Sequence, residues 1–74
     1  MSFIQCFDTA SGEALAVFVN LNLAEAVYME QIYGSDLYNV KIVVGGHKYD
    51  MFDEPVESNK ASNAILQVTG LKGK

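Results

Sequence analysis

The chain contains no arginine, and its five basic residues, all lysines, stand against nine acidic ones, so its net charge is −4 over 74 residues. A chain of this charge is repelled by phosphate backbones, which excludes ordinary nucleic-acid binding. Surfaces that stack bases combine aromatic rings with cations. We therefore expect the four tyrosines and four phenylalanines to serve core and interface packing.

Cysteine and histidine occur once each, as Cys6 and His47. A lone cysteine cannot form an intramolecular disulfide, so we expect a reduced, cytoplasmic setting. One Cys and one His also cannot make a zinc site of standard composition. No cation or helix start near Cys6 in sequence would activate its thiol, so we expect it to be buried and inert. His47 lacks an orienting acid on its own strand face, which predicts a polar surface residue rather than a general base. We expect no enzymatic activity and no cofactor or metal.

Long apolar runs are also absent. No run approaches the roughly 20 residues of a membrane span, and residues 1–5 lack the basic and apolar regions of a signal peptide. We therefore expect no membrane association. Half of the residues are hydrophobic and 19% are charged, which is typical of a globular domain. We predict one domain over residues 1–70 with a flexible tail at 71–74. A core this small favours oligomerisation.

The most informative segment is 37–53, in which two β-rich runs flank Gly45-Gly46. A Gly-Gly pair predicts a tight hairpin, because glycine tolerates the positive φ angles of such a turn. One face of this hairpin is then apolar and the other carries an opposite-charge pair, as in a half-buried antiparallel sheet. The predicted cross-strand pairs are Val44–His47, Val43–Lys48, Ile42–Tyr49, Lys41–Asp50 and Val40–Met51.

Residues 3–8 and 13–21 predict two further strands joined by a turn around Gly12. Pairing Asp8 with Glu13 places Cys6 opposite Leu15, and Ile4 opposite Val17, on a core face. The other face is unusually apolar for a surface in solvent. It carries Phe3, Phe7, Ala14, Ala16 and Phe18. We predict that Phe3, Phe7 and Phe18 form an interface, most simply with a second copy of the chain.

Residues 22–33 fit two patterns. Asn22 with Glu25 resembles a helix capping box, and Ala24, Val27, Tyr28 and Ile32 fall at helical spacing. This interpretation gives two strand-strand-helix units. Alternation of residues 27–32 between two faces predicts a strand instead, which gives a five-stranded meander followed by a helix. Local propensity favours the helix.

The segment after Phe52 changes character. Asp53-Glu54-Pro55 predicts a helix start, since Pro suits the first turn and acids suit the positive end of the dipole. A stripe of small and aliphatic side chains would pack this helix on the sheet, and Gly70 would end it. The stripe consists of Ala61, Ala64, Ile65 and Val68.

Four acidic residues gather where the hairpin meets the predicted helix. They are Asp50, Asp53, Glu54 and Glu57. Their spacing does not match a calcium loop, and no glycine provides its sharp turn. We interpret this acidic patch as helix capping and solvated surface. With the excess of negative charge, it also raises the hypothesis of an acidic inhibitor that occupies a basic site on another protein.

The order of these segments resembles a recurrent layout in very small bacterial and phage proteins. The relevant segments are 19–21 (Val-Asn-Leu), 27–30 (Val-Tyr-Met-Glu) and 40–49 around Gly45-Gly46, then Asp53-Glu54-Pro55 and a short helix. FlbD-like proteins, which are associated with flagella, share this layout, and the strand portion of LytTR-type DNA-binding domains is similar. The resemblance covers about residues 18–66. It implies extended backbone at 24–32 and thus favours the strand.

The chain departs from these families at two points. Ala24 stands where a larger aliphatic residue is usual, and the basic DNA-contacting residues of LytTR domains are missing. Neither DNA binding nor a catalytic residue is therefore implied by the resemblance.

The sequence as a whole predicts an α+β fold, a curved antiparallel β-meander of four to five strands with one C-terminal helix packed on it. We expect a non-enzymatic binding or accessory module that acts through a homo-oligomeric surface. The alternatives are the acidic inhibitor or nucleic-acid mimic and small-molecule binding near His47. The predicted core comprises Ile4, Cys6, Leu15, Val17, Val27, Val40, Ile42, Tyr49, Met51, Ala61, Ile65 and Val68.

Overall fold

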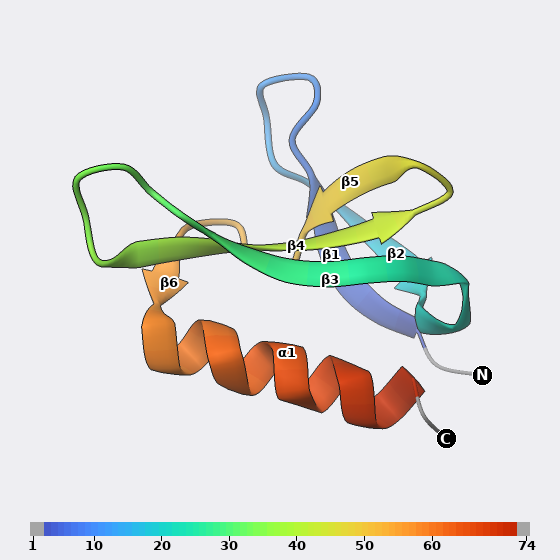
Figure 1. Ribbon diagram of the computed structural model, residues 1–74. Coiled ribbons are helices and arrows are strands. Elements are labelled where there is room, and N and C mark those ends of the chain that lie inside the picture. The colour runs from blue at the N-terminus through green and yellow to red at the C-terminus, as the bar shows by residue number, and fades with distance from the viewer. Residues whose placement is uncertain (1–2, 73–74) are drawn as a thin grey trace.

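The computed structural model describes residues 3–72, and it describes side chains as far as Gly70. It is an antiparallel sheet with one C-terminal helix, which confirms the predicted α+β class (Figure 1). The helix α1 runs along one face of the sheet beneath β3 and β4. The elements are β1 (Phe3–Asp8), β2 (Leu15–Asn20), the short 3-10 helix η1 (Leu21–Leu23), β3 (Ala24–Gln31), β4 (Leu37–Val44), β5 (His47–Asp50), β6 (Val56–Glu57) and α1 (Ser58–Lys72).

The strands lie in the order β2-β1-β5-β4-β3. β6 pairs with the start of β4, at a part of that strand with which β5 does not pair. Strands β3, β4 and β5 therefore form a meander, and the β1–β2 hairpin joins it where Phe7 pairs with Asp50. The two edge strands, β2 and β3, are connected only by Leu21–Leu23. A connection this short requires the two edges to approach each other, so the sheet must curl around the core, as predicted.

The β4–β5 hairpin has the predicted register from Val44–His47 to Lys41–Asp50. Gly45 and Gly46 adopt φ angles of +60° and +80°, the left-handed region that a primed turn requires. The Gly46 N–H donates a hydrogen bond of 2.8 Å to the Glu25 carboxylate on β3. The turn is thus fixed both by its own backbone and by the neighbouring edge strand.

The β1–β2 register differs from the prediction by two residues, because Asp8 pairs with Leu15 and not with Glu13. The loop is longer than expected because its own hydrogen bonds hold it closed. The Ala10 N–H donates to the Asp8 carboxylate, and the Gly12 N–H donates to the Thr9 carbonyl. Pairing begins only at Leu15.

The two-residue shift has one consequence for the core. A shift of two keeps every side chain on its predicted face, since side chains alternate with a period of two. It moves Leu15 to the end of the ladder, where its side chain is 51% exposed, so the prediction that Leu15 is a core residue is wrong. Val19 and Leu21, which were not predicted, are buried in its place.

Residues 24–31 form strand β3, so the strand hypothesis is confirmed and the helical alternative is wrong. Local propensity is overridden because β3 pairs with β4 from Ala24 to Gln31 and buries Ala24. The predicted capping pair at Asn22 is not used. Instead the Asn20 side chain accepts a hydrogen bond from the Asn22 N–H and caps η1.

The helix begins at Ser58, later than the predicted start at 53–55. Val56 and Glu57 pair with the start of β4, and Val56 is buried, so this backbone is extended before the helix begins. Gly70 does not end the helix, which continues to Lys72. The tail predicted from residue 71 is therefore helical as far as Lys72, and residues 73–74 lie outside the described part.

The core lies between α1 and the face of the sheet below it. The predicted stripe is confirmed, because Ala61, Ala64 and Val68 are buried, and the partly exposed Ile65 packs against the cluster that contains Ala61. One cluster joins Cys6 of β1 and Ile42 of β4 to Val68. The fully or nearly buried apolar residues are Cys6, Val19, Leu21, Ala24, Val40, Ile42, Val56, Ala61, Ala64 and Val68.

Candidate functional site

The outer face of the β1–β2 hairpin exposes two large aromatic side chains. Phe3 and Phe7 alternate with Cys6 on β1 and so point away from the core, and Phe18 lies opposite Gln5 on this same side. Phe18 is 71% exposed, Phe3 is 52% exposed, and Phe7 is half-buried. We call Phe3, Phe7 and Phe18 the aromatic face. Sequence reasoning placed all three on one side, and the structure does so too.

The aromatic face continues onto an edge strand. Strand β2 pairs only with β1 among the described strands, so its other edge has no strand partner there. Its sequence, Leu-Ala-Val-Phe-Val-Asn, has no charge and no proline. Natural edge strands are usually blunted by charged residues, proline or bulges. β2 has none of these features.

The opposite edge of the sheet differs. Strand β3 carries Glu25 and Glu30, and its pairing with β4 shifts register between Ala24 and Ala26. Charge and an irregularity of this kind both discourage pairing with another strand. The sheet thus has one protected edge and one unprotected edge.

The chemistry of this surface is that of binding. Burying one exposed phenylalanine side chain contributes about 1.5–3 kcal/mol. The strand edge adds backbone donors and acceptors, which recognise another extended strand. Phe3, Phe18 and β2 provide no nucleophile, acid or base.

The acidic patch predicted at 50–57 is not one surface. Asp50 is buried, and its Oδ1 lies 2.6 Å from Lys41 Nζ. The Thr9 hydroxyl donates a 3.1 Å hydrogen bond to Asp50 Oδ2. In the described part of the chain no hydrogen bond of good geometry reaches Oδ1, so the ion pair with Lys41 offsets the burial of this oxygen. Asp50 is consequently unavailable to a partner.

The sequence identified the Lys41–Asp50 pair but not its burial. Cross-strand spacing is enough to place the two side chains opposite each other. Their burial depends on β1, which lies against β5 at Phe7, and on Thr9 of the following loop. Those contacts join residues about forty positions apart. No pattern within a short stretch of sequence therefore predicts them.

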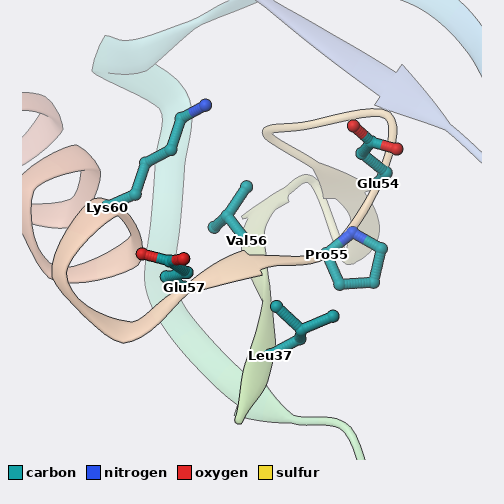
Figure 2. A pocket seen from close by; sticks show the side chains of 6 residues that line it. All are labelled: Leu37, Glu54, Pro55, Val56, Glu57 and Lys60. Atoms are coloured by element: carbon teal, nitrogen blue, oxygen red, sulfur yellow. The ribbon is translucent and has the colours of Figure 1, made fainter. Parts of the chain in front are cut away.

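Glu54 and Glu57 of the predicted patch line a shallow hollow of about 290 Å³ between β4, β6 and the start of α1 (Figure 2). Glu54 and Glu57 lie on either side of Val56, and the Lys60 side chain extends away from the Glu57 carboxylate. Lys60 Nζ also lies 5.1 Å from the centre of the Phe52 ring. The hollow is lined by both charge signs and by Leu37, Pro55 and Val56, so it does not present a purely acidic surface. Asp53 is exposed outside it.

His47 lies at the rim of the sheet, as predicted for a polar residue of a hairpin end. Its Nε2 is 3.3 Å from Asp8 Oδ1, and its ring lies against Tyr49 with centroids 4.6 Å apart. The orienting acid is therefore Asp8 of β1, and not Asp50, which lies on the other face. The Ala10 N–H, and next the His47 side chain, hold the pKa of Asp8 below its ordinary value of 3.8. Neither His47 nor Asp8 lines the hollow at the start of α1.

Cys6 is fully buried, as predicted. Burial, with a smaller contribution from the charge of Asp50, raises the pKa of its thiol to about 11. A thiol with this pKa is almost wholly protonated at neutral pH and is a poor nucleophile.

The described residues provide neither a metal-binding cluster nor a membrane-spanning helix. Within residues 3–72 no group of three or more His, Cys, Asp or Glu side chains is placed to hold a metal ion. No helix in this part of the chain is both long and apolar enough to cross a membrane.

No protein-family model, curated protein or solved structure matches the chain. The resemblance to FlbD-like and LytTR-type proteins therefore stays a prediction.

Proposed function

We propose that this chain is a small, non-enzymatic protein-binding module that self-associates through its aromatic face. One observation carries the proposal: Phe3 and Phe18 of adjacent strands are more than half exposed on the same side of the sheet. Large exposed apolar groups that adjoin one another are a mark of interaction sites. Association would also stabilise the fold, because the contact between two copies would add to the apolar area that this small core buries.

The two alternatives have less support. An acidic inhibitor would need clustered, accessible carboxylates, but Asp50 is buried against Lys41, and the hollow that Glu54 and Glu57 line also contains Lys60. Small-molecule binding near His47 would need a hollow at that site, and His47 does not line the hollow described at the start of α1. The negative net charge keeps nucleic acids from being the favoured partner. The lone, buried Cys6 suits a reducing compartment, so the proposal places the module in the cytoplasm.

The proposal is tested by amide NMR spectra of the labelled chain over a dilution series. We expect concentration-dependent shifts in β1 and β2, centred on Phe3 and Phe18. The exposed side of α1 around Leu66, which is 70% exposed, serves as an internal control and should not shift. Spectra that do not change with concentration, or changes centred on Glu54 to Lys60, would contradict the proposal.

A further inference from the structure

The aromatic face and the unprotected edge belong to the same strand, β2. We infer that β2 pairs antiparallel with β2 of a second copy about a two-fold axis, so that two sheets join into one. This inference rests on the proposed function and specifies how the two copies meet. Pairing of this kind satisfies the outward backbone groups of β2 and brings the two aromatic faces side by side.

The composition of β2 suits a second copy as its partner. In a two-fold pairing each residue lies opposite itself or a near sequence neighbour of the other copy, so any charge meets a like charge. β2 carries no charge. The chain as a whole has a net charge of −4, so most other surfaces would repel a second copy. The neutral edge is where that repulsion is least.

The pairing register follows from the two faces of the strand. Residues that lie opposite each other must point to the same face, and Phe18 points outward whereas Val17 points toward the core. Only two central registers then keep both faces continuous, with Val17 or Phe18 on the two-fold axis. In both, Phe18 packs on the outer side of the seam, against Ala16 or Phe18 of the partner subunit.

The other edge does not offer an equivalent seam. Two β3 strands paired about a two-fold axis would line the contact between them with Glu25 and Glu30 of both copies. Pairing of β2 with β3 of another copy leaves one free edge on each side and produces open filaments rather than a closed dimer.

Cross-linking at the two ends of β2 tests the geometry. Ala14 and Asn22 are exposed and uncharged and flank the strand. With Phe18 on the axis Ala14 of one copy lies opposite Asn22 of the other, and with Val17 on the axis Asn22 lies two residues further along. Two Ala14 positions are about 20–26 Å apart in these registers, at roughly 3.3 Å per residue. We therefore mix Ala14→Cys and Asn22→Cys chains, add a short bis-maleimide, and identify products by mass. Circular dichroism checks that both variants keep the fold.

We expect the mixed 14–22 product to exceed either same-position product by at least several-fold. Wild type is the control, since Cys6 is buried and should not react. Same-position products, or a ladder of higher oligomers, would overturn the two-fold β2 pairing. Association that Phe18→Glu abolishes, but that yields no 14–22 product, would overturn this pairing and leave the proposed function intact. A chain that stays monomeric would overturn both.

Discussion

At the scale of single residues, the outer face of the sheet combines exposed phenyl rings with one buried ion pair. Asp50 pairs with Phe7 of β1 and Lys41 of β4, so the carboxylate lies between two neighbouring strands. Taking a charge out of water is costly unless a partner of opposite charge stays close. Lys41 has this role, and Thr9 supplies a further hydrogen bond.

Replacing Lys41 by methionine should lower the free energy of unfolding by about 2–3 kcal/mol, because the buried Asp50 loses its counter-charge. Urea unfolding measures the change. The matched control is Lys48→Met on β5, since Lys48 is exposed, and its effect should stay within about 0.5 kcal/mol. The double variant Lys41→Met/Asp50→Leu should recover part of the loss. Equal effects of Lys41→Met and Lys48→Met would contradict a stabilising role for the pair.

Asp8 links stability to pH. Hydrogen bonds from the Ala10 N–H and from His47 lower the pKa of Asp8 in the folded chain. A carboxyl group with a lowered folded pKa contributes stability above its unfolded pKa and loses that contribution as pH falls through the folded value. The stability advantage of wild type over Asp8→Asn should thus be present above about pH 4 and shrink below it. Urea midpoints across this range give the difference, and a pH-independent difference would be inconsistent with this account.

At the scale of elements, two glycines in different backbone conformations contribute differently to the stability of the hairpin and the helix. Gly46 has a φ of +80° and donates its N–H to Glu25. Gly70 lies inside α1, without a positive φ, and a Cβ at that position would meet nothing within 4 Å. The same substitution should therefore have opposite effects at the two sites.

Gly46→Ala should destabilise the fold by about 1–2 kcal/mol, because an alanine pays a steric penalty in the left-handed region. Gly70→Ala should stabilise the fold by up to about 1 kcal/mol. The gain should be well below this limit, because Gly70 lies near the end of the helix. Thermal unfolding of the two variants measures both. A loss of stability in Gly70→Ala as large as that in Gly46→Ala would mean that α1 does not include Gly70.

The elements differ in how far the sequence predicted them. The β4–β5 register followed from Gly45-Gly46 alone, because the turn and its strands are contiguous. The predicted β1–β2 register was wrong by two residues. The loop that contains residues 8–12 makes its own hydrogen bonds, and these set the loop length. The helix start was wrong because Val56 pairs with β4, a contact between distant segments. The aromatic face was correctly placed, since an error of two residues preserves the alternation of faces.

At the scale of the whole molecule, the sheet covers one side of a small core and leaves its outer side in contact with solvent. The helix packs on the inner side against Cys6, Ile42 and Val40. The outer side carries the aromatic face and ends at an uncharged edge. A second copy would bury these groups and extend the sheet, and no rearrangement of the core is required for it.

The most direct test is the solution mass by light scattering over a concentration series. Phe18→Glu is compared with Leu66→Glu, because these residues are 71% and 70% exposed and lie on different elements, β2 and α1. We predict that wild type and Leu66→Glu rise toward the dimer mass while Phe18→Glu remains a monomer. Wild type that is monomeric at every concentration, or equal dissociation by both variants, would contradict self-association through the aromatic face.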